Sequence, residues 1–363
     1  MSLHEIRDQE TAVRFVRNIL RANRIPNGLL FYGPGGVGKG LTAVELAKAI
    51  NCEKQDGDAC DACLACRKVT NGNHPDITYL SPSEKTRLIK KDDIDGINEL
   101  AALRPFESQW RIFIIQDADR MNPPAQNHFL KTLEEPPGKS LFILLTEFPR
   151  VLLPTIRSRC QQVRFRALRQ ETVADLLRRE RDLPEELAES LAGIAEGQMT
   201  RALDLVDSEK RNVVLSLTSR LAEGEDPVEL AEEFTKFLAE ERKQLEDHLK
   251  ATMAYDSADE VSRADMERLK EERLAQLAAM SKRDMLEYLY LLQTWYRDEM
   301  IFAVTRDRSR VWNKDQFERL ESGEGANPSE KLQAIETARM YLDRFINEER
   351  VFRDLFLTLA VSP

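Results

Sequence analysis

A glycine-rich run near the N-terminus has the residues of a phosphate-binding loop. Residues 33–39 read Gly-Pro-Gly-Gly-Val-Gly-Lys, follow a short apolar run and precede a helical pattern, which is the setting that a G-x-x-x-x-G-K motif requires. Glycines let backbone N–H groups surround phosphate oxygens at the positive end of a helix, and the lysine reaches the terminal phosphates. The sequence predicts that a nucleotide there would contact Gly33, Gly35, Gly36, Gly38 and Lys39.

The residues that would hold Mg²⁺ beside such a loop are missing. The motif continues after Lys39 with Ser or Thr, whose hydroxyl binds the metal, but this chain has Gly40. A second apolar run, residues 112–115, is followed by Gln116 and Asp117, where a metal-orienting Asp and a water-activating Glu are usual. Because phosphoryl transfer depends on positioning and charge compensation, we predict weak ATP or ADP binding and an impaired Mg²⁺ site.

A cysteine cluster follows the loop. Four of the five cysteines fall within residues 51–67 with the spacing C-x7-C-x2-C-x2-C. Such a set in a cytosolic protein is typical of a tetrahedral zinc site, and no open ligand position is evident, so the zinc would be structural. An iron–sulfur cluster and free thiols are the alternatives, although no proline follows the last cysteine as in the common ferredoxin run. The predicted metal ligands are Cys52, Cys60, Cys63 and Cys66.

The elements that position these residues alternate between helical patterns and short apolar runs. Residues 29–32, 112–115 and 141–145 are continuous apolar segments, which indicates strands buried on both faces of a parallel sheet. Helical stretches lie between them. The sequence therefore predicts a layered α/β domain over residues 1–166, with the cysteine module at about 51–67 as part of it.

No strand pattern follows residue 168. Residues 171–179 and 185–194 have amphipathic helical patterns, and Gly197 precedes another helix, so we predict a small helical domain over residues 167–207. Residues 208–363 are helical throughout. Within them, residues 240–277 are rich in Glu, Lys and Arg, which predicts a projecting helical hairpin that turns near residues 256–259. A solvated face is the usual meaning of so many charges, and a partner-binding arm is the alternative.

The composition limits the classes of protein and the partners. With 42% hydrophobic and 32% charged residues, the chain is a helix-rich globular protein rather than a disordered one. No apolar run is long enough to cross a bilayer and no signal peptide is evident, so we expect a cytoplasmic location without membrane contact. The net charge of −10 gives no overall basic footprint for nucleic acid. The densest arginine cluster comprises Arg157, Arg159, Arg164, Arg166 and Arg169.

Four further segments resemble one family. Residues 127–137 (NHFLKTLEEPP) look like its helix and loop after the second strand, and Thr146 falls at its sensor-1 position. Residues 157–160 match its Ser-Arg-Cys motif, and Gly197 with Arg201-Ala202-Leu203 resembles its sensor-2 segment. On these residues the chain resembles the AAA+ clamp-loader family, specifically the bacterial DNA polymerase III delta-prime and gamma/tau subunits. The resemblance is dense over residues 5–207 and thin beyond.

The resemblance implies a fold, partners and residue roles. The three predicted domains would be an AAA+ P-loop domain with a zinc module, a helical lid and an all-α collar. Arg159 would be an arginine finger that reaches the ATP site of a neighbouring subunit, and Arg201, Asp117 and Thr146 would face a nucleotide in cis. The partners would be gamma/tau- and delta-type subunits in a hetero-pentamer, which loads a sliding clamp onto primed DNA as part of the DNA polymerase III holoenzyme.

Two functions within this family, and one outside it, compete. Gly40 and Gln116 favour a delta-prime-like stator without an efficient ATPase of its own. Lys39, Asp117 and Thr146 would support a gamma/tau-type ATPase motor. An AAA+ regulator of transcription or repair would need DNA- or ligand-binding segments that the sequence does not display, and polymerase chemistry has no suitable carboxylate pair.

Overall fold

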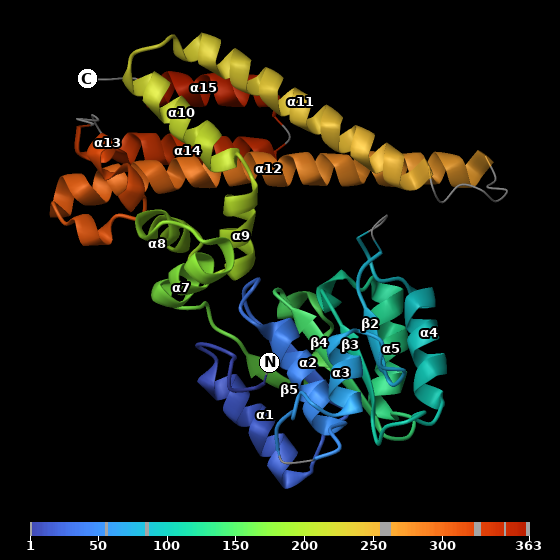
Figure 1. Ribbon diagram of the computed structural model, residues 1–363. Helices are drawn as coiled ribbons and strands as arrows, with labels where there is room; N and C mark the ends of the chain where they lie inside the picture. The colour runs from blue at the N-terminus through green and yellow to red at the C-terminus, as the bar shows by residue number, and fades with distance from the viewer. Residues whose placement is uncertain are drawn as a thin grey trace. The chain divides into compact units, whose positions relative to one another are not determined.

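The computed structural model describes residues 2–54, 57–83, 87–254, 263–322, 328–344 and 346–360 (Figure 1). They form two compact units, one comprising Met1–Thr172 with Glu196–Arg201 and the other Val173–Ala195 with Ala202–Pro363. Helices α7 (Gln170–Arg181) and α9 (Met199–Asp207) contain residues of both units. The predicted division into three domains stays a prediction.

The N-terminal unit is built on a parallel sheet of five strands in the order β2-β3-β4-β1-β5. The three predicted apolar runs are its central strands: β1 (Gly28–Tyr32), β3 (Arg111–Ile115) and β4 (Ser140–Thr146). Every residue of β3 and β4 is buried, as expected for strands covered on both faces. The edge strands are β2 (Ile77–Leu80) and β5 (Gln161–Arg164).

Helices cover both faces of this sheet (Figure 1). One layer contains α1 and α2, and the other contains α4, α5 and α6. The helices of the unit are α1 (Glu10–Ala22), α2 (Lys39–Ile50), α3 (Leu64–Thr70), α4 (Lys91–Ala102), α5 (Pro123–Glu134) and α6 (Pro154–Arg159), with 3-10 turns at Ala118–Arg120 and Pro149–Val151. The predicted α/β fold is confirmed.

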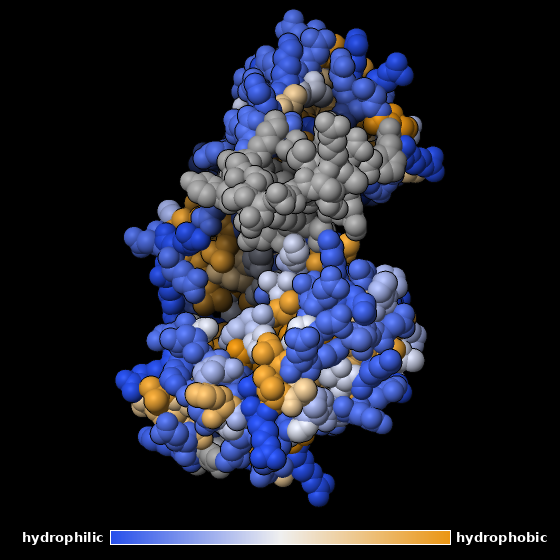
Figure 2. All heavy atoms as spheres, turned by 90° about the vertical axis from the view of Figure 1, so that its right-hand side faces the viewer, coloured by the Kyte–Doolittle hydropathy of each residue, from blue (hydrophilic) through white to orange (hydrophobic). Residues whose placement is uncertain are grey.

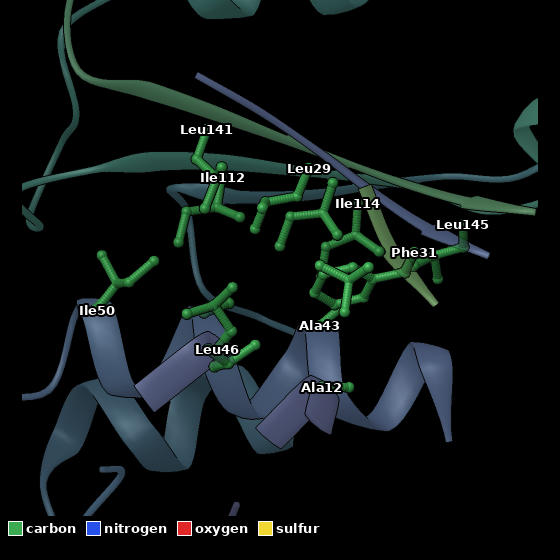
Figure 3. Packing of buried hydrophobic residues seen from close by; sticks show 14 of the residues in the cluster. Ala12, Leu29, Phe31, Ala43, Leu46, Ile50, Ile112, Ile114, Leu141 and Leu145 are labelled. Carbon is green, nitrogen blue, oxygen red and sulfur yellow. The ribbon is translucent and has the colours of Figure 1, made fainter. Parts of the chain in front are cut away.

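Alternate residues of each central strand lie in the two hydrophobic cores on opposite faces of the sheet. Leu29, Phe31, Ile112 and Ile114 point toward α1 and α2, where they meet residues such as Leu46 (Figure 3). Their neighbours in the strands, including Leu30, Phe113 and Phe142, point the other way and pack against α4 and α5. Because strand side chains alternate between faces, a continuous apolar run fills both cores at once.

The second unit is helical throughout its described residues. Its helices, besides parts of α7 and α9, are α8 (Glu185–Ile194), α10 (Lys210–Ala222), α11 (Pro227–Ala254), α12 (Arg263–Thr305), α13 (Phe317–Ser322), α14 (Pro328–Asp343) and α15 (Glu348–Ala360), with 3-10 turns at Arg308–Arg310 and Lys314–Gln316. The absence of strands after β5 in the described part of the chain agrees with the sequence pattern.

An aromatic cluster ties α11, α12 and α15 together. The ring of Phe234 lies 5.0 Å from that of Phe352 and 5.3 Å from that of Tyr288, both edge-on, and 5.6 Å from that of Phe356. Tyr288, Phe352 and Phe356 are fully buried. Edge-to-face pairs stabilise beyond their buried area by about 0.5–1.5 kcal/mol each. This cluster joins the three helices through buried rings.

The predicted charged hairpin falls on α11 and α12. Helix α11 precedes the predicted turn and α12 follows it. The turn itself, at residues 256–259, lies outside the described residues. The loop predicted near Gly323 also lies outside them.

The surface of the N-terminal unit is mixed. Figure 2 shows its face that carries α4, where hydrophobic side chains form patches among hydrophilic ones. Exposed apolar side chains in this part of the chain include Leu100, Leu103 and Phe106, at the end of α4 and in the loop that follows. None of the described helices is both long and apolar enough to cross a membrane.

Candidate functional site

The predicted phosphate loop connects β1 to α2. Gly38, in the left-handed region with φ of 96°, is the N-cap of α2, so the loop ends at the positive end of a helix. Gly36 also has a positive φ of 66°, and a Cβ there would lie only 2.2 Å from the backbone nitrogen of Thr200. The start of α9 therefore lies directly against the loop, in the same unit. Arg201 follows Thr200, so the sensor-2 segment predicted from sequence is next to the loop.

Lys39 is turned inward. Its ammonium group donates hydrogen bonds to the carbonyl oxygens of Gly33 at 2.6 Å and Pro34 at 2.5 Å. Burial lowers the pKa of Lys39, and the carboxylates of Glu147, Asp117 and Asp119 act in the opposite direction. The lysine that would reach terminal phosphates is thus bound to its own loop.

The positions where the motif places Mg²⁺ ligands are Gly40 and, after β3, Gln116 and Asp117. Gly40 offers no hydroxyl, although a Cβ there would meet only Leu145, at 3.9 Å. Thr42 does not replace it, because its buried hydroxyl donates to the Gly38 carbonyl at 2.8 Å. Gln116 directly follows β3 and is exposed, and Asp117 comes next in a left-handed conformation. Burial, with the neighbouring Asp119, raises the pKa of Asp117.

Thr146 ends β4 beside the loop. Its backbone oxygen accepts a hydrogen bond from Gly33 N at 3.2 Å, which couples the end of β4 to the start of the loop. Its buried hydroxyl donates to the carboxylate of Asp119 and accepts from the backbone N–H of Phe148 at 2.9 Å. Of the two carboxylates after β3, Asp119 is therefore the one that binds the Thr146 hydroxyl.

The four clustered cysteines converge. The sulfur atoms of Cys52, Cys60, Cys63 and Cys66 all lie within 4.8 Å of one another. In a regular tetrahedron around a metal at about 2.3 Å, sulfur atoms are about 3.8 Å apart, so little movement would be needed. The four thiols can therefore hold a metal ion, and among the described residues no other group of this kind occurs.

Backbone donors already surround the sulfur atoms. Cys60 accepts from the N–H of Cys63 at 3.3 Å, and Cys63, the N-cap of α3, accepts from the N–H of Cys66 at 3.4 Å. The N–H groups of Cys63 and Ala62 lower the pKa of Cys60 to about 6, whereas burial raises the pKa of Cys66. Hydrogen bonds to sulfur favour the thiolate, which is the form that binds metal.

The cysteine module is attached to α2. Cys52 follows the end of that helix, and the ammonium of the buried Lys48 pairs with Asp61 of the module and with Glu45 at 2.9 Å. His74 is not part of the sulfur group. It is buried, accepts from the N–H of Asp76 at its Nδ1 atom at 3.1 Å, and lies just before β2.

Arg159 is the last residue of α6. Its guanidinium forms an ion pair with Glu134, at the end of α5, and donates to the Thr155 carbonyl at 3.2 Å. About a third of its side chain is exposed (36%). The following Cys160 is buried, and its sulfur would lie 2.9 Å from a Cβ at Gly28. The backbone is thus fixed next to Arg159 while the guanidinium stays accessible.

Two acidic residues near the loop were not among the site residues predicted from the sequence. Asp119 binds the Thr146 hydroxyl, and Glu147 lies against Gly35, where a Cβ would be 2.7 Å from its Oε1 atom. The only sequence signal was that they follow the ends of β3 and β4, because the carboxyl ends of parallel strands meet at one edge of a sheet.

Comparison with known proteins supports the resemblance. Residues 8–169 match the family model described as DNA polymerase III, delta subunit. The segment contains the phosphate loop, the four cysteines and Arg159. The delta' subunit of DNA polymerase III from Bacillus subtilis is 34% identical over 186 residues, which is 51% of this chain and 56% of that protein. Residues 8–169 are thus similar to the delta-type subunits of DNA polymerase III.

The relationship extends to both kinds of subunit. The tau subunit of the Bacillus subtilis polymerase is 32% identical over 205 residues, 55% of this chain and 36% of that protein. The aligned part of the chain thus spans about half the length of the delta' relative and about a third of the tau relative. Among solved structures, a gamma subunit-related protein from Thermotoga maritima aligns over 94% of this chain and 97% of that chain, at 18% identity and a TM-score of 0.43, too low to support a conclusion.

Proposed function

We propose that the chain is a delta-prime-like subunit of the DNA polymerase III clamp loader, a stator that supplies Arg159 to the ATP site of a neighbouring subunit. The observation that carries this proposal is the combination of a phosphate loop without its metal ligands and an accessible arginine in an Arg-Ser-Arg-Cys motif. Gly40 and Gln116 remove the hydroxyl and the carboxylate that would orient Mg²⁺. Without a positioned metal, phosphoryl transfer loses most of its charge compensation.

The environment of Arg159 suits a group that acts in trans. Its ion pair with Glu134 is partly exposed on both sides, with 36% and 46% of the side chains accessible. Exposed pairs contribute about 0–1 kcal/mol, so exchange of Glu134 for a phosphate of the neighbour's nucleotide costs little. Burial of Cys160 against Gly28 holds the backbone that presents the arginine. An arginine finger contributes about 10³–10⁵ in rate where it completes a site.

The nucleotide site of the chain itself is vestigial in this proposal. ATP or ADP would bind weakly through Gly33, Gly35, Gly36, Gly38 and Lys39, with Asp117, Thr146 and Arg201 nearby. The inward hydrogen bonds of Lys39 to Gly33 and Pro34 support this view. No hydrolysis is assigned to the chain.

The cysteine group is a structural zinc site in the same proposal. Four thiolates leave no open position for a substrate, and sulfur ligands in a tetrahedral set favour Zn²⁺. When bound, zinc would fix the module that Cys52 and the Lys48–Asp61 pair attach to α2. An iron–sulfur cluster is the alternative for the same ligands.

The partners follow from the relatives. We propose a cytoplasmic hetero-pentamer with gamma/tau- and delta-type subunits, in which the helical unit forms a collar and the assembly places a sliding clamp on primed DNA. The net charge of −10 supports DNA contact through the assembly rather than through this chain alone. The charged α11–α12 arm has no assigned partner.

A gamma/tau-type motor is the alternative function. The tau relative favours it, as do Lys39, Asp117 and Thr146 at the expected places. Turnover of ATP by the isolated chain with Mg²⁺ distinguishes the two, measured beside a Gly40→Thr, Gln116→Asp double variant. The stator predicts negligible turnover by the native chain. Magnesium-dependent turnover on the order of 1 s⁻¹, the low end of typical enzyme rates, would establish the motor instead.

A further inference from the structure

A carboxylate lies on the phosphate loop itself. Glu147 follows directly after β4, and β4 is paired with β1, the strand that leads into the loop. A Cβ at Gly35 would be 2.7 Å from Oε1 of Glu147 and 3.7 Å from Oε2. The side chain therefore touches the loop at a position where only glycine leaves room for it in this conformation.

This carboxylate changes the charge that a phosphate group would meet. Lys39 is the only basic side chain of residues 33–39, and its ammonium is bound to the carbonyls of Gly33 and Pro34. Burial lowers the pKa of Lys39, and the carboxylates of Glu147, Asp117 and Asp119 raise it. An anion entering the loop would thus face a lysine that is already compensated and a second negative charge beside it.

We infer that Glu147 is a specificity-determining residue of the loop, whose negative charge disfavours nucleotide phosphate there. This effect is independent of the lost Mg²⁺ ligands, because it acts on binding of the polyphosphate without metal. It is also independent of Arg159 and of any partner subunit. Like charges a few ångströms apart at an exposed position repel by an amount that changes a binding constant about tenfold.

Isothermal titration of the isolated full chain with ATP and with inorganic tripolyphosphate, both without Mg²⁺, tests the inference. Glu147→Gln keeps the size of the side chain and removes its charge, so we expect about tenfold tighter binding of both ligands than in the native chain. Glu99→Gln, which removes one charge from the exposed face of α4, is the matched control and should not change binding. Tripolyphosphate lacks a base, so it reports the loop alone.

The outcomes separate charge from shape. The gain should shrink when salt rises from about 0.05 to 0.5 M, because exposed charges are screened over shorter distances. Equal affinities of the native chain and Glu147→Gln, or no binding by either at millimolar ligand, would overturn the inference. A gain in Glu147→Ala without one in Glu147→Gln would show a steric effect and overturn it as well. None of these results would touch the stator proposal.

Discussion

Replacement of Asp76 should strongly destabilise the N-terminal unit. Its carboxylate is fully buried just before β2 and accepts backbone N–H groups from Phe106 at 2.6 Å and from Glu107 and Ser108 at 2.9 Å. It also lies 3.3 Å from the guanidinium of Arg111, the first residue of β3. One side chain thus fixes the loop before β3, the strand that leads to Gln116.

The magnitude follows from what Asp76→Ala leaves behind. Three backbone donors lose their partner, and the buried Arg111 loses its counter-charge. Breaking a buried, hydrogen-bonded ion pair costs about 3–5 kcal/mol. Arg111 keeps hydrogen bonds to the carbonyls of Leu100 at 2.7 Å and Arg104 at 3.3 Å, so we expect the lower end of that range. At about 2 kcal/mol per molar urea, the unfolding midpoint would fall by roughly 1.5 M.

Urea unfolding followed by Trp110 fluorescence measures this loss. Trp110 lies next to Arg111 in the sequence. The substitutions Trp295→Phe and Trp312→Phe, made in every variant, remove the fluorescence of the helical unit. Asp92→Ala, at an exposed position in the first turn of α4, is the control and should cost less than about 1 kcal/mol. A loss below 1 kcal/mol for Asp76→Ala would refute the reasoning that this carboxylate holds the loop.

Three further predictions concern the metal, the pH dependence and the loop. Purified native chain should contain about one equivalent of zinc by atomic emission, and Cys63→Ser should lower the zinc content several-fold. Clearly less than one equivalent in native chain, purified with its thiols reduced and without a chelator, would contradict the zinc proposal. Burial disfavours the charged form of Asp76, but its N–H donors and Arg111 outweigh this and lower its pKa. Its contribution is therefore fully present above the unfolded pKa of about 3.9 and is lost as pH falls through the lowered folded pKa. The urea midpoints of native chain and Asp76→Asn should thus stay apart above about pH 5 and converge as pH falls below about 4. Gly40→Thr alone should not lower the free energy of unfolding, as measured by thermal denaturation, because a Cβ there meets only Leu145 at 3.9 Å. A loss of unfolding free energy above about 1 kcal/mol would show that the loop needs glycine at this position.

The central fold could be predicted because buried parallel strands leave a simple signal. The runs at β1, β3 and β4 are apolar without interruption, since both faces of each strand are covered. The edge strand β5 has no such run: three of its four residues are exposed, and only Val163 is buried. Its pairing with β1 is a property of the folded sheet, which sequence periodicity does not reveal.

The candidate site was predictable where spacing along the chain decides it. The glycines, Lys39 and the four cysteines are close in sequence, and the structure places each group together. Contacts between distant segments were not predictable. The approach of Glu147 to Gly35, of Thr200 to Gly36 and of Glu134 to Arg159 depends on the order of the strands. The first two contacts place protein atoms directly against the phosphate loop.

The most direct test of the stator proposal is ATP hydrolysis by a mixture of gamma/tau- and delta-type subunits with and without this chain. The account predicts that the native chain raises the rate, that Arg159→Ala removes the added rate, and that Arg150→Ala, at an exposed residue of the 3-10 turn before α6, does not. Equal stimulation by native chain and Arg159→Ala would contradict the assignment of Arg159 as the group that acts on the neighbouring site.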